Sequence, residues 1–293
     1  RAWWAMNSIR ATVSKVLTYS IVDGPGNRLV VFLQGCNFDC SACHNPHTIG
    51  ECNHCGDCIP ACHADALSLV DGRIAFDAAA CDQCDDCLEV CPINANPMVR
   101  DYSVEEIVAL AREHRPFLSG VTVSGGEPTR QLKFVVALFA AIKADEALEG
   151  LDCFIDSNGN LGASGWEHLL PVTDGVMLDI KSFDNVLHRE LTGKDNLKSL
   201  QSARLLHEAG KLYELRFLLV PGQTDGDAEL DRLVDFVRTL GGEVRVRLNA
   251  FQHHGVRPKA RDWAPMSRTG VGRAAARLRE AGIRNVVEPA VYV

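Results

Sequence analysis

Residues 28–46 read RLVVFLQGCNFDCSACHNP, an apolar run that ends at Gly35 and is followed by Cys36, Cys40 and Cys43. The run is short, rich in strand-forming residues and closed by glycine, so it predicts a buried strand. Three closely spaced thiols suit a 4Fe-4S cluster, in which one of the four irons would then lack a protein thiolate. Because catalytic metal sites differ from structural ones by an open position, we predict that a substrate or cofactor binds this iron.

The rest of the chain alternates predicted strands with amphipathic helices. Besides residues 28–35, the predicted strands are 120–124, 151–157, 175–181, 212–220 and 243–251. The predicted helices are 103–114, 130–148, 195–209, 226–240 and 267–281, and the first begins with a capping box of Ser103 and Glu106. This alternation indicates a parallel sheet with right-handed crossovers. Six strand–helix units instead of eight predict an α/β fold, a partial (β/α)6 TIM-like barrel.

Polar or glycine-rich residues follow five of the six predicted strands, where the chain reads QGC, SGGEP, DSNG, DIKS and PGQTD. In parallel α/β folds, ligands bind outside the carboxyl ends of the strands. One such ending is a weak signal, but five together indicate a ligand site along this edge.

Eleven of the twelve cysteines fall between residues 36 and 91. Two runs, CNHCGDCIPAC and CDQCDDCLEVC, have the CxxCxxCxxxC spacing of bacterial ferredoxins, in which the fourth cysteine ligates the other cluster. We therefore predict an inserted ferredoxin-like domain with two 4Fe-4S clusters, one on Cys52, Cys55, Cys58 and Cys91 and one on Cys81, Cys84, Cys87 and Cys62. Zinc sites are the alternative for paired CxxC motifs. The remaining cysteine, Cys153, is predicted to be a buried thiol.

Composition and charge limit the organisation and the partners of the chain. Residues 1–48 are predicted to start the barrel, residues 49–99 to form the two-cluster insertion, and residues 100–293 to complete the barrel. A net charge of −8 argues against nucleic acid or an anionic membrane as the main partner, and no run of about 20 apolar residues predicts a membrane-spanning helix. The opening RAWWAMNSIR lacks the features of a signal peptide, and Met6 is a candidate native start. Together with the cluster-type cysteines, this predicts a cytoplasmic protein.

The cysteine loop and the strand ends carry a family resemblance. The CxxxCxxC loop followed by SGGEP resembles the radical SAM (S-adenosylmethionine) superfamily. Within it, VDGPGNR, FLQGCNFDCSACHNP, MLDIKS, LTG and RFLLVPG are similar to the activating enzymes of glycyl radical enzymes. The two ferredoxin-type runs match the subgroup with auxiliary clusters, and TVSGGEPTRQLKFVVALFAAIK, WEHLLPV and VRLNAF resemble its YjjW type. The resemblance spans roughly residues 12–255.

The resemblance implies a set of site residues. The open iron would be chelated by the methionine part of SAM, with Ala42, Cys43 and His44 on the adenine side. Further SAM-binding residues would be Gly125, Gly126, Glu127, Asp179, Ile180, Lys181 and Arg216. In some members a monovalent cation lies beside SAM, which here would involve Asp156, Ser157, Met177 and Asp179. Many relatives have a SAM-contacting histidine where this chain has Gln252, and whether Gln252, His253 or His254 makes that contact stays open.

The implied activity is an anaerobic radical reaction. A reduced cluster on Cys36, Cys40 and Cys43 would cleave SAM to methionine and a 5'-deoxyadenosyl radical, which would abstract hydrogen from a glycine of a partner enzyme. A flavodoxin or a ferredoxin-type protein would supply the electron. Two alternatives are a radical SAM enzyme that acts on a small molecule and a non-catalytic iron–sulfur electron-transfer protein. SAM cleavage by the reduced protein would exclude the electron-transfer protein and leave the activating enzyme and the small-molecule enzyme as the two possibilities.

Overall fold

The computed structural model describes residues 9–241, 243–253 and 255–289. By their packing the residues form two compact units, of which the first contains residues 1–37 and 45–151 and the second residues 38–44 and 152–293. The cysteine loop is therefore divided, with Cys36 in the first unit and Cys40 and Cys43 in the second. The boundaries predicted for a separate insertion at residues 49 and 99 stay a prediction. No helix in the described ranges is long and apolar enough to cross a membrane.

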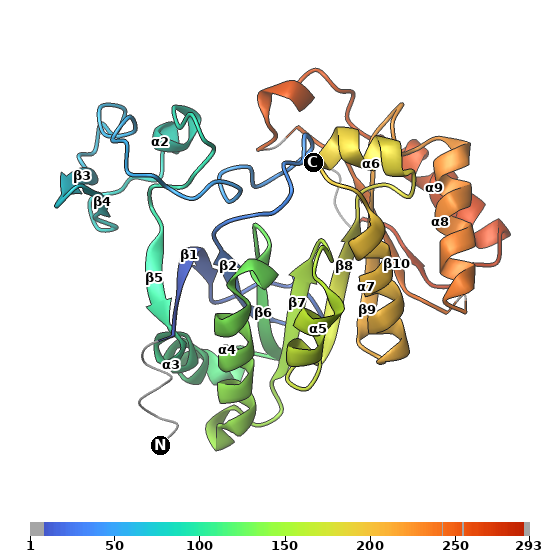
Figure 1. Ribbon diagram of the computed structural model, residues 1–293, viewed down its shortest axis with the longest axis horizontal. Helices are drawn as coiled ribbons and strands as arrows, with labels where there is room; N and C mark the ends of the chain where they lie inside the picture. The colour runs from blue at the N-terminus through green and yellow to red at the C-terminus, as the bar shows by residue number, and fades with distance from the viewer. Residues whose placement is uncertain (1–8, 242, 254, 290–293) are drawn as a thin grey trace. The chain divides into compact units, whose positions relative to one another are not determined.

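The first unit contains a mixed sheet with the strand order β6-β2-β1-β5 (Figure 1). Strand β2 (Arg28–Leu33) pairs in parallel with β6 (Gly120–Gly125), which confirms the two strands predicted in this part of the chain. Strand β1 (Arg10–Leu17) runs antiparallel to β2 and to β5 (Arg100–Ser103), and neither β1 nor β5 was predicted. The apolar residues of β2 are fully buried at Leu29, Val30, Val31 and Leu33, so this strand is part of the core.

Two helices of the first unit show how local sequence sets their ends. Helix α3 (Val104–His114) begins with the predicted capping box, in which the Ser103 hydroxyl accepts from the Glu106 amide at 3.2 Å. Helix α4 (Leu132–Ala144) is shorter than the predicted helix over residues 130–148, because 3₁₀ turns flank it at Pro128–Gln131 and Glu146–Leu148. The Asp145 carboxylate accepts from the Ala147 amide at 2.9 Å and so competes with continuation of the helix. A further 3₁₀ turn, Arg115–Phe117, follows α3.

The buried Arg28 fastens the VDGPGNR segment to β6. Its guanidinium donates to the Val121 carbonyl at 3.0 Å, to the Thr122 hydroxyl at 3.1 Å and to the Pro25 carbonyl at 3.1 Å. The Thr122 hydroxyl in turn donates to the Asp23 carbonyl at 2.8 Å. The arginine of this motif therefore has a structural role, which is to hold the loop before β2 against the neighbouring strand.

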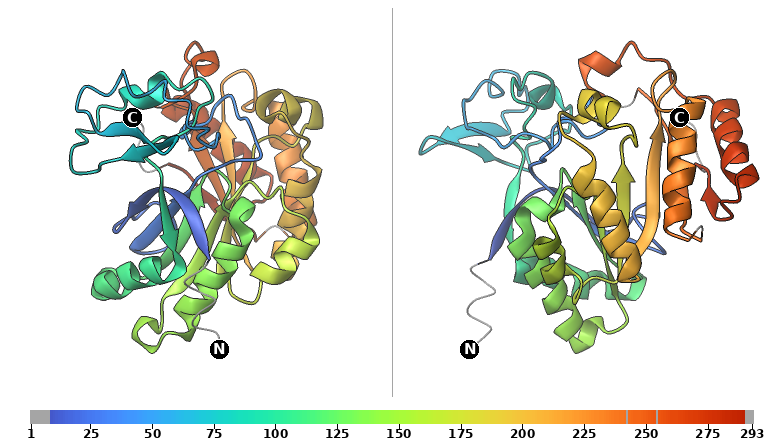
Figure 2. Two further views of the ribbon diagram at one scale, coloured as in Figure 1. Left: turned by 60° about the vertical axis from the view of Figure 1, so that its left-hand side comes forward. Right: turned by 45° about the vertical axis from the view of Figure 1, so that its right-hand side comes forward.

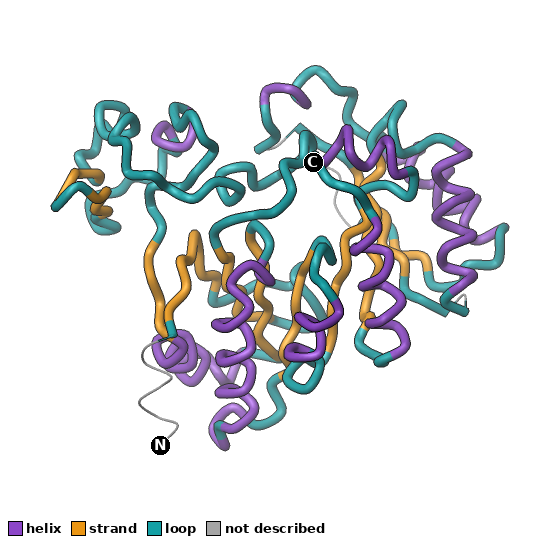
Figure 3. Tube along the Cα trace, viewed as in Figure 1, coloured by secondary structure: helices purple, strands orange, loops and turns teal. Residues whose placement is uncertain are grey.

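The cysteine-rich stretch over residues 49–99, called the insertion below after its predicted role, is mostly loop, as Figure 3 shows. Its regular elements are an antiparallel hairpin of β3 (Leu67–Val70) and β4 (Arg73–Phe76) and the one-turn helix α2 (Asp86–Glu89). Its buried core consists of Cys58, Leu67 and Cys87, against which a few half-buried apolar side chains pack. Such a small core is typical of segments that depend on metal ligation for their stability.

The second unit is a parallel α/β sheet with the strand order β11-β10-β9-β8-β7. Its strands are β7 (Asp152–Ser157), β8 (Gly175–Ile180), β9 (Leu212–Leu219), β10 (Val246–Ala250) and β11 (Val286–Val287). Its helices are α5 (Ala163–Leu169), α6 (Asn185–Thr192), α7 (Leu197–Glu208), α8 (Asp227–Thr239) and α9 (Arg268–Glu280), with a 3₁₀ turn at Pro258–Ala260. Figure 2 shows α7, α8 and α9 alongside the strands from two directions. The strands and helices predicted in this half are confirmed, whereas α5, α6 and β11 were not predicted.

Candidate functional site

In the first unit, backbone hydrogen bonds fasten the start of the cysteine loop to the SGGEP segment. The Gly126 amide donates to the Leu33 carbonyl and the Glu127 amide to the Gly35 carbonyl, both at 2.9 Å. On the other side, the Cys36 amide donates to the Ile49 carbonyl at 3.0 Å. Cys36 therefore lies on a backbone that is held between the end of β6 and residues 48–49, which limits how far its thiol can move.

Gly125 and Gly126 are required by this close approach of backbones. Gly125 has a φ of +115°, and a Cβ atom there would lie 2.3 Å from the Leu33 carbonyl oxygen. At Gly126 a Cβ atom would lie 2.4 Å from the Gly35 carbonyl oxygen and 2.6 Å from that of Thr48. Contacts this short with backbone are not relieved by a side-chain rotation. The close packing of the cysteine loop is therefore enough to explain why both positions are glycine. This explanation does not depend on the close approach of a ligand, for which the two glycines were predicted.

We expect Gly126→Ala to destabilise the protein by about 1–3 kcal/mol, the range for adding a methyl group to a tightly packed site. The added Cβ atom would displace Gly35 and with it the backbone of Cys36. Thermal unfolding measures the loss of stability. Gly272→Ala is the matched control, because its Cβ atom would meet nothing within 4 Å and alanine favours the helix in which it lies. Equal unfolding temperatures for the two variants would contradict the packing explanation.

Two further polar side chains of the first unit are buried beside the loop. The Glu127 carboxylate accepts from the Thr129 amide at 3.0 Å and from its hydroxyl at 2.7 Å, so it caps the following 3₁₀ turn. Gln34, which sequence reasoning missed, donates from Nε2 to the His47 carbonyl at 2.8 Å and to the Gly50 carbonyl at 2.6 Å. Gln34 therefore closes the cysteine loop on itself, and its QGC context offered only a weak signal of this role.

In the second unit, the end of α6 holds the middle of the cysteine loop. The Asp39 amide donates to the Thr192 carbonyl and the Ser41 amide to the Leu191 carbonyl, both at 2.9 Å. The Phe38 ring meets the buried His188 ring edge to face, with centroids 5.4 Å apart. The LTG motif thus supplies the carbonyl groups that position the backbone around Cys40.

The start of α6 is held in turn by Glu229 of α8. This side chain is 4% exposed and accepts from the Ser182 hydroxyl at 2.6 Å and from the Asp184 amide at 3.2 Å. Asp184 is the N-cap of α6, where its carboxylate accepts from the Val186 and Leu187 amides at 2.9 and 3.0 Å. The segment that follows DIK, the helix α6 and residues 38–44 therefore form one hydrogen-bonded series.

Lys181 of the DIK segment lies close to Cys40 and Cys43, the two cysteines of the loop that belong to this unit. Its ammonium is 2.7 Å from the Asp179 carboxylate. Although burial opposes its charge, the negative groups of Asp179, Cys40 and Cys43 raise the pKa of Lys181 above its usual range. The structure thus brings Lys181 together with Cys40 and Cys43, and a cation beside cluster thiolates can also bind a carboxylate ligand. Ile180, between the two charged residues, is fully buried and anchors the segment in the sheet.

Arg216 of β9 contacts the two preceding strands, β7 through Asp156 and β8 through Met177. One guanidinium nitrogen lies 3.3 Å from the Asp156 carboxylate and another 2.8 Å from the Met177 sulfur. Although burial opposes its charge, Asp156 and Asp179 raise the pKa of Arg216 above its usual range, so it stays a cation. Asp156 and Met177 were expected to adjoin a monovalent cation, but a guanidinium already contacts both. Ser157 is buried in the same strand as Asp156, and a monovalent cation at these residues stays a prediction.

The segment after β10 contains the residues whose SAM contact was left open. The Gln252 side chain donates from Nε2 to the Met266 carbonyl at 3.2 Å, and His253 contacts the Trp263 carbonyl through Nε2. His254 lies outside the described residues. Of the loop residues predicted on the adenine side, Ala42 is half-buried, and the His44 ring lies 6.3 Å from that of Phe251. Gln252 and His253 therefore contact their own segment, whereas the His44 ring is tilted by 47° against the ring of the buried Phe251.

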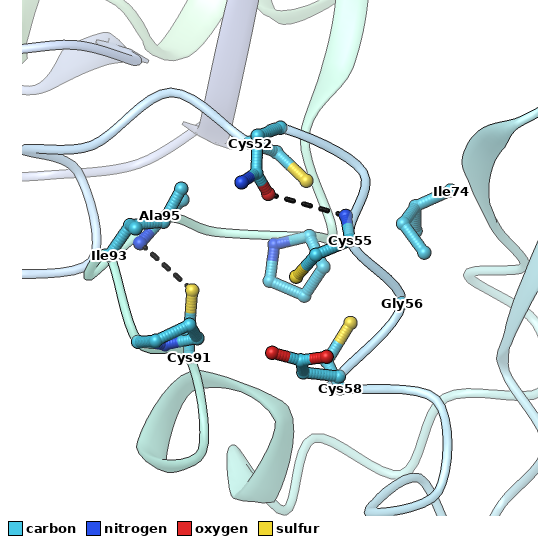
Figure 4. Close-up of a pocket in the computed structure, with 12 residues that line it drawn as sticks. Cys52, Cys55, Gly56, Cys58, Ile74, Cys91, Ile93 and Ala95 are labelled. Carbon is cyan, nitrogen blue, oxygen red and sulfur yellow. Dashed lines mark hydrogen bonds between the residues drawn. The ribbon is translucent and has the colours of Figure 1, made fainter.

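Four cysteines of the insertion surround one small pocket. Figure 4 shows the sulfur atoms of Cys52, Cys55, Cys58 and Cys91 directed toward a common space, which Ile74, Ile93 and Ala95 also line. Burial, and to a smaller degree the three neighbouring thiols, raise the pKa of Cys58. Four sulfur ligands in an apolar pocket fit a 4Fe-4S cluster or a zinc ion. These are the four cysteines that the ferredoxin spacing predicts for one cluster.

A second group of thiols surrounds the buried Cys87. Burial, followed by Cys58, Asp85, Cys62 and Cys84, raises the pKa of Cys87 to about 12. Cys62 also packs against the small core that contains Cys87. Three of the four cysteines predicted for the second cluster are thus neighbours, and the fourth, Cys81, accepts a hydrogen bond from the Gln83 amide at 3.4 Å.

The two cysteine runs share a backbone pattern as well as a spacing. The last cysteine of each run accepts from the amide four residues later, from Ala66 to Cys62 at 3.2 Å and from Ala95 to Cys91 at 3.3 Å. Left-handed φ angles recur at matching positions of the two runs, in the pairs His54 and Gln83, Gly56 and Asp85, and Asp65 and Asn94. The insertion is therefore a structural repeat, as a duplicated cluster-binding loop would be.

Comparison with known sequences identifies relatives over most of the chain. The family model described as the Radical SAM superfamily matches residues 30–236. A pyruvate formate-lyase-activating enzyme of Streptococcus mutans is 31% identical over 252 residues, which are 84% of this chain and 80% of that protein. The corresponding enzyme of Staphylococcus epidermidis is 28% identical over 254 residues, covering 85% and 84% of the two chains.

Comparison with solved structures identifies the same fold. Streptococcus suis SuiB, bound to its precursor peptide SuiA, superposes with a TM-score of 0.58 at 16% identity and covers 95% of this chain and 51% of its own. A radical SAM methyltransferase from Sphaerobacter thermophilus gives 0.52 at 18% identity, covering 77% and 69%. These likenesses confirm the α/β partial-barrel class that the sequence predicts.

Proposed function

The chain belongs to the radical SAM superfamily, and on that premise we propose that it activates a glycyl radical enzyme. The observation that carries the proposal is the 31% identity to a pyruvate formate-lyase-activating enzyme across 80% of that enzyme's length. Membership of the superfamily implies a 4Fe-4S cluster and SAM. The finer assignment that we propose is the YjjW type, with two additional clusters and an unidentified glycyl radical enzyme as partner.

The bound cluster would supply one electron to the sulfonium of SAM, so that the carbon–sulfur bond breaks into methionine and a 5'-deoxyadenosyl radical. We propose that Cys36, Cys40 and Cys43 hold this cluster. The backbone hydrogen bonds of Gly126 and Glu127 near the start of the loop, and those that Asp39 and Ser41 donate to the end of α6, support this assignment, because each fixes the part of the loop backbone that it contacts. The radical would take a hydrogen atom from a glycine Cα of the partner, which leaves 5'-deoxyadenosine and a glycyl radical.

Charged residues at the strand ends would bind and orient SAM. Lys181, kept protonated beside Asp179, Cys40 and Cys43, is suited to the SAM carboxylate. Arg216 is suited to the same end or to the ribose hydroxyls, and Glu127 to the ammonium group. Ala42 and His44 would adjoin the adenine. A monovalent cation beside SAM, held by Asp156, Ser157, Met177 and Asp179, remains part of the proposal.

We propose that residues 49–99 bind two further 4Fe-4S clusters, with the cross-over ligation described above. The pocket shared by Cys52, Cys55, Cys58 and Cys91 and the repeated backbone pattern support it. These clusters would relay electrons from a flavodoxin or a ferredoxin-type reductant, or help to dock the partner. A cytoplasmic, anaerobic setting is the corresponding proposal for its location.

The test is anaerobic incubation of the reconstituted protein with SAM, a reductant and a glycyl radical enzyme, beginning with pyruvate formate-lyase. A glycine-centred doublet in the electron paramagnetic resonance spectrum is the expected result. SAM cleavage without a doublet for any glycyl radical enzyme of the source organism would favour a small-molecule substrate. The absence of SAM cleavage would instead contradict the enzyme assignment and favour an electron-transfer protein.

A further inference from the structure

A buried carboxylate at the centre of the second unit binds three arginines. Glu214 of β9 is 1% exposed, and its oxygens accept from the Nε atoms of Arg216 at 2.8 Å, Arg245 at 2.7 Å and Arg247 at 2.8 Å. Arg245 precedes β10 and Arg247 lies within it, so the carboxylate ties two neighbouring strands together through side chains. Although burial opposes its ionisation, Arg247, Arg216 and Arg245 lower the pKa of Glu214, which keeps it charged.

The position of Arg216 depends on this carboxylate. Glu214 accepts from the Nε atom of Arg216, and the two outer nitrogens of the guanidinium are thereby directed to Asp156 and to the Met177 sulfur. The pairing register places Glu214 beside Met177 and Arg216 beside Asp179. Without Glu214, three guanidinium groups would share one region with no carboxylate between them, and like charges in a poorly solvated site repel strongly.

We propose that Glu214 is a positioning residue that presents Arg216 to SAM by neutralising and orienting the three arginines. This inference rests on the proposed function, in which Arg216 contacts SAM. It also assigns a role to Arg245 and Arg247, whose side chains are 33% and 28% exposed and which stabilise the carboxylate from β10. Breaking a buried ion pair by removing one partner leaves the others uncompensated, which is why this residue should matter more than an exposed acid.

Chemical rescue tests the proposal. In Glu214→Ala the three arginines keep a space the size of a small carboxylate, so formate should bind there. We expect KM for SAM to rise about tenfold or more, in line with the loss of a charged hydrogen-bonded contact, with a smaller change in kcat, and formate to restore both the KM and part of the unfolding temperature. Chloride at the same ionic strength should restore neither.

Two variants keep the test decisive. Glu214→Gln retains the shape and one oxygen acceptor, so it should fold even where Glu214→Ala does not, and it should show an intermediate KM without response to formate. Asp231→Ala is the matched control, because Asp231 pairs with Arg277 at 2.7 Å on the surface and 58% of its side chain is exposed. It should leave the KM unchanged.

The outcomes separate this inference from the proposed function. If the unaltered protein cleaves SAM and neither Glu214 variant changes the KM or responds to formate, the role of Glu214 is wrong while the enzyme assignment stands. If both variants lose stability without any change in KM, Glu214 only holds the sheet together, and the positioning role is likewise wrong. If the unaltered protein does not cleave SAM, the proposed function is wrong. Formate-dependent stabilisation of Glu214→Ala would then still show that the three arginines bind a carboxylate at this position.

Discussion

Replacement of Cys36 by alanine is expected to abolish SAM cleavage while leaving the two clusters that we propose for residues 49–99 in place. The loop provides three thiolates, so the loss of one leaves the cluster with too few ligands to remain bound in an orderly geometry. Because changes even in the residues around metal ligands typically cost about 10- to 100-fold, a lost ligand should lower the rate by more than about 100-fold. Iron content should fall from about twelve to about eight atoms per chain, since each cluster contains four.

The matched control for this experiment is Cys153→Ala. Cys153 is fully buried within β7 of the second unit and lies in neither ferredoxin-type run. Its replacement should leave the iron content unchanged and cost only the stability expected from a small core cavity. SAM cleavage that survives Cys36→Ala, or that is lost equally in Cys153→Ala, would show that the cysteine loop does not hold the reactive cluster.

Much of the fold follows from local sequence, because its strands and helices alternate in long periodic segments. The strand at residues 28–35, the capping box at Ser103 and the helix over residues 226–240 each depend on neighbours a few positions away. Such features can be predicted without knowing the tertiary structure. The antiparallel strand β1, with its alternation of buried Ala11 and Val13, carries a similar local signal.

The residues that could not be predicted act through distant partners. Glu214 is one acidic residue in an apolar strand, and its role appears only when β10 brings Arg245 and Arg247 beside it. Gln34 binds carbonyl groups that belong to a later part of the loop. Arg216 was predicted from the resemblance, but its contacts with Asp156 and Met177 depend on the pairing of three strands. Side-chain networks of this kind need the register of the sheet, which the sequence pattern does not supply.

A second large effect is expected when two cysteines of the insertion are replaced together. The losses of bound iron should not add when both cysteines ligate the same cluster. In the cross-over scheme, Cys58 and Cys91 belong to one cluster and Cys62 to the other, whereas a scheme without cross-over puts Cys58 and Cys62 together. The pocket that Cys52, Cys55, Cys58 and Cys91 share favours the first scheme.

Two double variants distinguish these schemes. Cys58→Ala/Cys91→Ala should alter a single cluster, leaving about eight irons bound and spectra close to those of either single variant. Cys58→Ala/Cys62→Ala should alter both insertion clusters, leaving only the cluster of the Cys36 loop intact. Mössbauer spectra count the intact clusters in each sample, and the loop cluster can be recognised because SAM perturbs it. The reverse pattern, with both clusters altered in the Cys58 and Cys91 pair and one in the Cys58 and Cys62 pair, would establish ligation within each run. Zinc in place of iron would contradict both schemes, since it would show that the insertion binds metal for stability and carries no electrons.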